Sequence, residues 1–270
     1  MMKRVGVLAA AALGMGGGSA AAQEAVLPHD TFTIQSAAVG EVRRINVYTP
    51  PGYAAGATRF PVLYMPDGGV QEDFPHVVAT VDAAIRAGEM RPVLVVGIEN
   101  TERRRDMTGP TDIASDRTIA PRVGGSAAFR RFIASELIPE VRRRYRVTDE
   151  TAIIGESLAG LFIMETFLLQ PDLFDTYIAL SPSLWWNDEA LVRAAPGHLR
   201  AHPAMRAALF LSSADEENIA PAAACLAEIF RADAPAGLRW EYRPRPDLQH
   251  GTIYRASAPQ VLRAMLPPRG

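Results

Sequence analysis

One serine in this sequence stands in a pattern that supports nucleophilic chemistry. Ser157 lies in Gly155-Glu-Ser-Leu-Ala-Gly160, after a short apolar run, Ala152 to Ile154, and before a longer one, Leu158 to Gln170. The first run is short and β-branched, which favours a buried strand, and the second has the length of a helix. A sharp strand-to-helix turn exposes a serine hydroxyl group and points the free N–H groups of the helix at it. We therefore predict that Ser157 is a nucleophile and that the N–H of Leu158 stabilises an oxyanion.

The motif departs from the usual G-x-S-x-G at its last position. Ala159 stands there, and Gly160 follows one residue later. Alanine is small enough for the close approach of strand and helix. The alternative interpretation is a chance string beside a strand, because short motifs recur by accident. The strand–turn–helix context, together with the partner residues described next, favours the catalytic interpretation.

A serine nucleophile needs a base, and one histidine is placed to supply it. His250 follows the last predicted strand, Leu238 to Tyr242, in what reads as a loop. The other histidines do not follow a predicted strand in this way, and they are His29, His76, His198 and His202. A lone loop histidine is usually only solvent-exposed, but this one completes an ordered set with the serine and an acid.

The acid is predicted just past the strand from Ala207 to Ser213. Asp215, Glu216 and Glu217 follow that strand in succession. A carboxylate at this place orients the histidine and stabilises its protonated form. The alternative is that these acids only complement the N-terminus of the next helix, which suits at least one of them. The residues alone do not choose among the three.

A second oxyanion donor is expected after the apolar strand that begins at Phe60. That strand opens into Asp67-Gly68-Gly69, where Gly68 or Gly69 could present a backbone N–H toward Ser157. An ordinary strand-ending turn is an equally good interpretation of Asp-Gly-Gly.

Substrate-binding residues are predicted in the long loop from residue 99 to residue 125. A loop of this length inside a compact domain is more often functional than idle. Arg103 and Arg105 are candidates to bind an anionic or catechol-like group, and Arg104 reads as solvent-exposed. The alternative is a solvated loop in which an arginine pairs with Asp106 or Asp112.

Paired tryptophans follow another predicted strand, Thr176 to Leu180. Trp185 and Trp186 could form an aromatic wall of the site, because ligands bind at the carboxyl ends of parallel strands. One of the two is expected only to pack in the core.

The order of the predicted elements favours an α/β-hydrolase fold, with a mostly parallel central sheet flanked by helices. An N-terminal hairpin, Thr31 to Ser36 and Val42 to Tyr48, precedes alternating strands and helices. The helices are expected over Pro75 to Arg86, over Ser126 to Tyr145 with Ser126 as its cap and Pro139 interrupting or kinking it, and over Ala256 to Leu266.

The N-terminus and the composition narrow the class of protein. Residues 1–22 have the basic start, short apolar core and small-residue end of a secretory signal peptide, which leaves residues 23–270 as a single hydrolase domain. We therefore expect a periplasmic or secreted protein.

The formal net charge of −2 gives no reason to expect a nucleic acid or a membrane surface as a partner. No metal or nucleotide motif is present, so no cofactor is predicted, and the single cysteine, Cys225, is expected to be buried.

The motifs together resemble the esterase D-like and enterochelin (siderophore trilactone) esterases of the α/β-hydrolases. The resemblance runs from about Thr31 to the C-terminus and is carried by residues 62–68, 97–110, 155–162, 181–186 and His250-Gly251. It implies a serine hydrolase with Ser157 as nucleophile and His250 as base. It also implies that Glu216, rather than Asp215, is the acid, because relatives have a glutamate after a run of small residues.

The sequence therefore predicts an exported serine carboxylic-ester hydrolase that acts through an acyl-enzyme on a small-molecule ester. A siderophore-type lactone and an aryl ester are the substrates that the resemblance and the arginines of the loop from residue 99 to residue 125 favour. An acyltransferase of the same fold and a non-catalytic ligand-binding protein stay open as alternatives, and the oligomeric state is not indicated.

Overall fold

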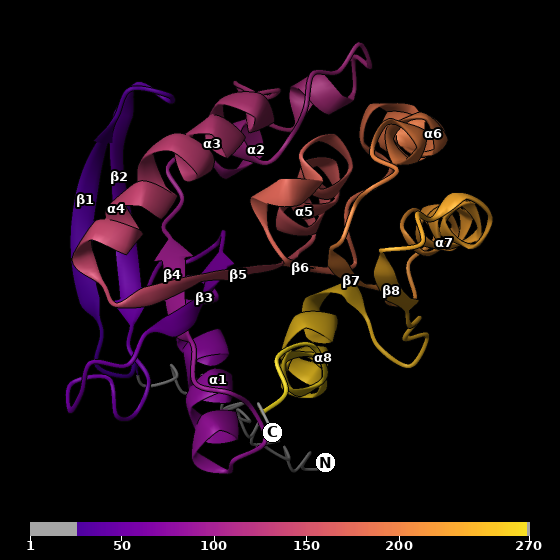
Figure 1. Ribbon diagram of the computed structural model, residues 1–270. Helices are drawn as coiled ribbons and strands as arrows, with labels where there is room; N and C mark the ends of the chain where they lie inside the picture. The colour runs from indigo at the N-terminus through magenta and orange to yellow at the C-terminus, as the bar shows by residue number, and fades with distance from the viewer. Residues whose placement is uncertain (1–25, 269–270) are drawn as a thin grey trace, which may run out of the picture.

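The computed structural model describes residues 26–268, which share one eight-stranded sheet in the order β1-β2-β4-β3-β5-β6-β7-β8 (Figure 1). Strands β1 (Asp30–Ser36) and β2 (Glu41–Tyr48) form an antiparallel hairpin, and β2 also pairs antiparallel with β4 (Leu94–Ile98). All later pairings are parallel, and the other strands are β3 (Phe60–Met65), β5 (Val147–Glu156), β6 (Thr176–Leu180), β7 (Ala208–Ser212) and β8 (Arg239–Tyr242). The prediction of a mostly parallel sheet is confirmed.

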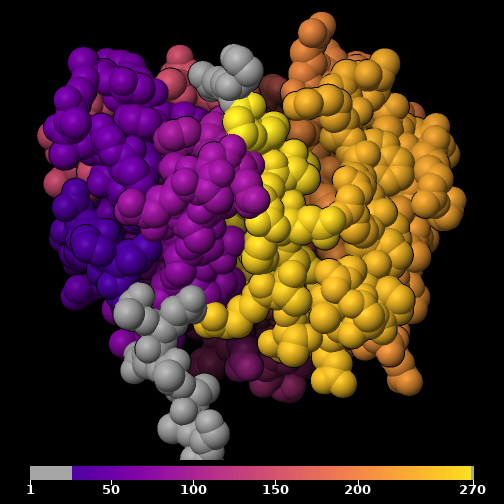
Figure 2. All heavy atoms as spheres, turned by 90° about the horizontal axis from the view of Figure 1, so that it is seen from below, coloured from indigo at the N-terminus to yellow at the C-terminus, as the bar shows by residue number. Residues whose placement is uncertain are grey.

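Helices cover both faces of the sheet. On one face lie α1 (Phe74–Arg86) and α8 (His250–Met265), and Figure 2 shows α8, in yellow, running along α1. The other face carries α3 (Ser126–Phe132), α4 (Ile138–Arg144), α5 (Leu158–Leu169), α6 (Trp186–Ala201) and α7 (Ala220–Asp233), with the short α2 (Arg103–Asp106) beside α3 (Figure 1). Each face has its own apolar core.

Burial explains why the central strands read as unbroken apolar runs. Strands β3, β4, β6 and β7 are buried along their whole length, because helices lie on both of their faces. Helix α5 is apolar on every side, since it packs on β5 and β6 and against α6, while Phe162 contacts Phe129 of α3.

The helix predicted from residue 126 to residue 145 is interrupted, as expected, but the interruption precedes Pro139. It is α3, a π-helical turn over Ile133–Leu137 and α4, with Pro139 in the first turn of α4. Ser126 is not its cap: Gly125 holds that place, and the buried Ser126 hydroxyl donates to Glu165 at 2.7 Å.

Two further expectations were wrong. The closing helix begins at His250 rather than at Ala256, because the side chains of Gln249 and Thr252 form a capping box that extends the helix toward the N-terminus. Cys225 is exposed, since it lies on the outer side of α7.

The predicted signal peptide lies outside the described residues. Within residues 26–268, no helix has the length and apolar character that crossing a membrane requires.

Candidate active site

The parallel strands bring distant parts of the sequence to one edge of the sheet. The carboxyl ends of β3 to β8 point the same way, so the segments that follow them meet. Ser157 follows β5, Glu216 follows β7, and His250 follows β8.

Ser157 occupies the strained turn between β5 and α5. Its φ of 62° and ψ of −122° are rare for a residue with a side chain. The N–H of Ser157 donates to Leu180 at 3.0 Å, and its carbonyl oxygen accepts from the N–H of Ser183 at 3.0 Å. These bonds lock the backbone so that the hydroxyl group stays exposed at the edge of the sheet.

Small neighbours make the turn possible. A Cβ atom on Gly155 would lie 2.7 Å from the Cβ of Ala159, and one on Gly160 would lie 3.0 Å from Cα of Pro182. The strand and the helix therefore touch through residues without room for larger side chains, and alanine at position 159 fits.

The side chain of His250 lies between Ser157 and Glu216. Nε2 is 2.9 Å from the Ser157 Oγ, and Nδ1 is 2.5 Å from Glu216 Oε1. The second contact has the distance of an ion pair, although the Nδ1 atom lacks a partner with hydrogen-bond geometry in this rotamer. The Glu216 contact favours the tautomer with its proton on Nδ1, which leaves Nε2 free to accept the proton of Ser157.

Backbone bonds join the two loops that carry the acid and the histidine. The N–H of Asp215 donates to Leu248 at 2.9 Å, and the N–H of Arg245 donates to Ser213 at 2.7 Å. Asp215 and Glu217 are exposed, so Glu216 is the member of the acidic trio that the structure brings to His250.

Ser181 supports the acid, a role that sequence reasoning missed. Its buried hydroxyl donates to Glu216 Oε2 at 2.8 Å and accepts from the N–H of Ala214 at 2.8 Å. Ser181 reaches this position with a φ of 38°. The Ser-Pro-Ser run after β6 was the available signal, but its backbone conformation could not be read from the residue types.

Glu156 is a second carboxyl group at the histidine, and it was also missed. Its Oε1 lies 3.0 Å from His250 Nε2. The pKa of Glu156 is raised to about 8, mainly by burial, with smaller contributions from the charges of Asp73, Asp67 and Glu216 and against the opposing effect of Arg103. Position 156 is the variable residue of the motif, so no pattern pointed to it.

The predicted oxyanion donors differ in availability. Leu158 is the first residue of α5, so its N–H has no partner within the helix. The N–H of Gly68 instead donates to Ile98 at 2.9 Å, and that of Gly69 donates to Glu72 Oε2 at 2.7 Å. Gly68 is thus turned away, and Gly69 becomes a donor to another group only when the Glu72 side chain moves.

Arg103 is tied to the turn that precedes these glycines. Its Nε and Nη2 atoms donate to the two carboxylate oxygens of Asp67 at 2.6 and 2.8 Å. Asp67 is buried, has a φ of 54°, and also accepts from Asn100 at 2.5 Å. The Arg103 side chain stays 34% exposed, so it can both hold the turn and face a ligand.

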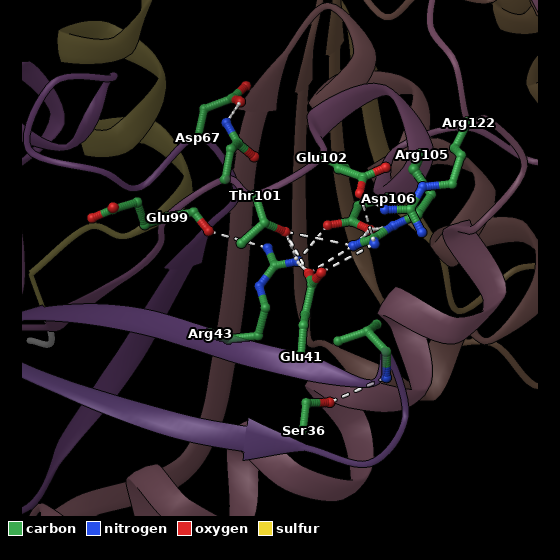
Figure 3. A network of polar contacts seen from close by, with 12 residues as sticks. Ser36, Glu41, Arg43, Asp67, Glu99, Thr101, Glu102, Arg105, Asp106 and Arg122 are labelled. Atoms are coloured by element: carbon green, nitrogen blue, oxygen red, sulfur yellow. Dashed lines mark hydrogen bonds and ion pairs between the residues drawn. The ribbon is translucent and has the colours of Figure 1, made fainter.

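Arg105, in contrast, belongs to an ion-pair network with Glu41, Arg43 and Asp106 (Figure 3). It donates to Glu41 at 2.7 Å and to Asp106 at 2.7 Å. The fully buried Arg43 pairs with the same two acids and lies over the ring of Phe129, 5.1 Å from its centroid. The network fixes the loop from residue 99 to residue 125 to β2, which is the structural role that the pairing alternative anticipated for an arginine.

The loop from residue 99 to residue 125 borders a hollow of about 570 Å³. Its lining includes Arg103, Arg104, Arg105 and Arg122. A larger hollow of about 680 Å³ lies at the opposite, amino-terminal end of the strands, around Arg206 and Arg239, so volume alone does not locate the site.

The two tryptophans differ in burial. Trp186 is 4% exposed and donates through Nε1 to Gly109 at 2.9 Å, which makes it a core residue. Trp185 is partly buried, two residues after Ser183, whose Oγ lies 3.4 Å from that of Ser157.

Across residues 26–268, no three His, Cys, Asp or Glu side chains gather closely enough to hold a metal ion.

Comparisons with known proteins agree with this architecture. Residues 36–224 match the family model described as "Putative esterase". The chain is 34% identical to the ferri-bacillibactin esterase BesA of Bacillus subtilis over 165 residues, 54% of each protein. It is 29% identical to the iron(III) salmochelin esterase of Escherichia coli O6:H1 over 57% of this chain and 35% of that protein. The chain thus spans about half of the first relative's length and about a third of the second's.

Solved structures share the fold. An IroE-like serine hydrolase from Shewanella oneidensis has a TM-score of 0.79 at 24% identity, covering 88% of this chain and 79% of that one. The BES protein from Bacillus cereus has a TM-score of 0.78 at 21% identity, covering 88% and 96%. The chain therefore shares the fold of these two proteins. Because the family model matches well over half of the residues, this chain belongs to the esterase family that the model describes.

Proposed function

We propose that the protein is a serine esterase that hydrolyses carboxylic esters through an acyl-enzyme. The observation that carries the proposal is the alignment of Ser157 Oγ, His250 and Glu216, at 2.9 and 2.5 Å, on a strained turn between a strand and a helix. Family membership and the names of the relatives support the same activity.

In the proposed mechanism the serine attacks first. His250 Nε2 removes the proton of the Ser157 hydroxyl group as Oγ bonds to the ester carbonyl carbon. Glu216 stabilises the imidazolium ion, and the N–H of Leu158 stabilises the oxyanion. We assign the second oxyanion donor to Gly69, with Glu72 leaving its N–H when substrate enters.

The tetrahedral intermediate formed by this attack then collapses and releases the alcohol. The bond from carbon to the leaving oxygen breaks, and His250 gives its proton to that oxygen. A water molecule, deprotonated by His250, attacks the acyl-enzyme, and the returning proton regenerates the Ser157 hydroxyl group. Acid and alcohol are the products, and no cofactor takes part in any step.

For the substrate we propose a siderophore-type lactone or an aryl ester with anionic or polar substituents. Two of the relatives are named for ferri-bacillibactin and iron(III) salmochelin, and Arg103, one of the arginines that line the hollow, is close enough to Glu156 to lower its pKa. Arg103 and Trp185 are the side chains that we assign to the acyl group. Loss of the preference for aromatic esters in Arg103→Ala and Trp185→Ala is the expected result, and unchanged selectivity would remove this part of the proposal.

We also propose that residues 1–22 direct export and that residues 23–270 are the mature single domain. The composition of the N-terminus supports this proposal. Mass spectrometry of the protein from a periplasmic fraction is expected to show a chain that begins at Gln23.

The test of the activity compares wild type with Ser157→Ala on p-nitrophenyl acetate to decanoate and on feruloyl and benzoyl esters. We expect turnover by the wild type and a loss of roughly 10⁴-fold or more in kcat for the variant. Equal background rates in both proteins, with no covalent labelling of Ser157, would contradict the esterase proposal and favour a ligand-binding protein.

A further inference from the structure

The Nε2 atom of His250 has two neighbours that compete for it. Ser157 Oγ lies at 2.9 Å and Glu156 Oε1 at 3.0 Å. In the mechanism above, Nε2 must carry a lone pair directed at the serine. Glu156 lies at nearly the same distance, and its carboxylate would favour a proton on Nε2. Its charge therefore bears directly on whether the histidine can act as a base.

Glu156 is held in a partly buried, mostly acidic environment. Its side chain is 15% exposed, and its Oε1 has no partner with hydrogen-bond geometry. The titratable and charged groups around it come from five segments, and they are Asp67 after β3, Asp73 before α1, Arg103 of α2, Glu216 after β7, and His250 and Tyr254 of α8. Arg103 is the one cation of fixed charge in this set, and it is already paired with Asp67.

The charge of Glu156 decides which ring nitrogen of His250 carries the proton. When Glu156 is neutral, the carboxylate of Glu216 alone attracts a proton, and the proton stays on Nδ1. When Glu156 is ionised, a carboxylate faces each nitrogen, so the tautomer with its proton on Nε2 becomes comparably stable. That tautomer cannot accept the proton of Ser157, and the added negative charge also opposes an oxyanion next to it.

We propose that Glu156 is a positioning residue that must keep its proton for His250 to act as the base, so that ionisation of Glu156 sets the alkaline limit of the reaction. The inference rests on the proposed esterase function. The burial that raises the pKa of Glu156 to about 8 is consistent with it, since the group then holds its proton at neutral pH. Because Glu156 and His250 are adjacent, the observed limit belongs to the pair.

The experiment measures the rate at which a neutral fluorophosphonate labels Ser157, from about pH 6 to about pH 10. Intact-protein mass spectrometry follows the labelling, so no substrate needs to be known. The variants are Glu156→Gln, which keeps the size and fixes the neutral state, and Glu217→Gln, a control at an exposed glutamate near the site. Glu156→Met replaces the first variant if it does not fold.

We expect the wild type and Glu217→Gln to lose roughly threefold or more of their labelling rate above about pH 8, and Glu156→Gln to keep a plateau there. A structural role alone would lower the rate of Glu156→Gln at every pH without changing the shape of the profile. The same alkaline loss in Glu156→Gln, or a flat wild-type profile, overturns the inference and leaves the esterase proposal standing. No labelling of Ser157 at any pH overturns both.

Discussion

At the scale of single residues, the three acids after β7 have separable roles. Glu216 Oε1 contacts His250 Nδ1 and its Oε2 accepts from Ser181, whereas Asp215 is exposed. Glu216→Gln removes the charge that holds the histidine proton on Nδ1, and we expect kcat to fall roughly 10²- to 10⁴-fold with little change in KM. Steady-state kinetics on the best ester of the panel measures this.

Asp215→Asn is the matched control for that substitution. It removes a carboxylate one position earlier, outside the site, and we expect kcat within roughly twofold of wild type. A larger loss in Asp215→Asn than in Glu216→Gln would exchange the two assignments.

The sequence predicts only part of what surrounds the serine. Ser157, His250 and an acid among residues 215–217 could be proposed because each follows a strand of one parallel sheet, and such ends converge. The choice of Glu216 among the three acids came from the family resemblance. Glu156 and Ser181 could not be proposed, because their roles depend on side-chain direction and on a φ of 38° at Ser181. The two predicted glycine donors show the same limit, since the residue type fixed the turn but not the partners of its N–H groups.

At the scale of elements, Gly68 sets how closely the turn after β3 packs on β4. A Cβ atom there would lie 2.2 Å from the backbone nitrogen of Ile98, and backbone cannot move aside cheaply. We expect Gly68→Ala to lower the free energy of unfolding by about 2–4 kcal/mol, as overpacking of this kind does. Urea denaturation measures the loss.

Gly56→Ala is the control for Gly68→Ala, because a Cβ atom at position 56 meets nothing within 4 Å. A change within about 0.5 kcal/mol is expected there. Equal free energies of unfolding of the two variants would contradict this prediction, because they would show that the turn can move away from β4 at little cost.

Element order was readable from the sequence because burial on both faces makes each central strand an unbroken apolar run. Helix ends were less readable. The capping box at Gln249 starts α8 six residues before the expected position, and the interruption expected at Pro139 is instead a π-helical turn over Ile133–Leu137. Both depend on local hydrogen bonds, which hydrophobic periodicity does not report.

At the scale of the whole molecule, the ion-pair network of Arg43, Arg105, Glu41 and Asp106 makes the stability of the fold depend on pH. The pKa of Glu41 is lowered from 4.5 to about 2, mainly by the hydrogen bond from Arg105, with smaller contributions from Thr101 and Arg43 and against the opposing effect of burial. A carboxylate with a depressed pKa adds stability that is complete above about pH 4.5 and is lost as the pH falls toward 2. The wild type is therefore expected to lose stability across this window.

Glu41→Gln tests this link. The variant is expected to be less stable than wild type at neutral pH and to approach it as the pH falls through this window, since the wild type loses the contribution there. Thermal unfolding from about pH 7 to about pH 2.5 measures the difference, with Glu217→Gln as an exposed control. A difference from wild type that does not depend on pH would contradict the assignment of Glu41.

The same network holds the loop that borders the hollow apart from the strands that carry the reacting groups. It anchors the loop from residue 99 to residue 125 to β2 through Arg43 and Asp106, whereas Ser157, Glu216 and His250 are supported by β5 to β8. Changes at loop positions other than Asn100, Arg103 and Asp106 can therefore alter the walls around a ligand without disturbing the groups that perform the chemistry. An exchange of this segment between relatives, with these three residues and Arg43 kept, offers a route by which the scaffold acquires a new specificity.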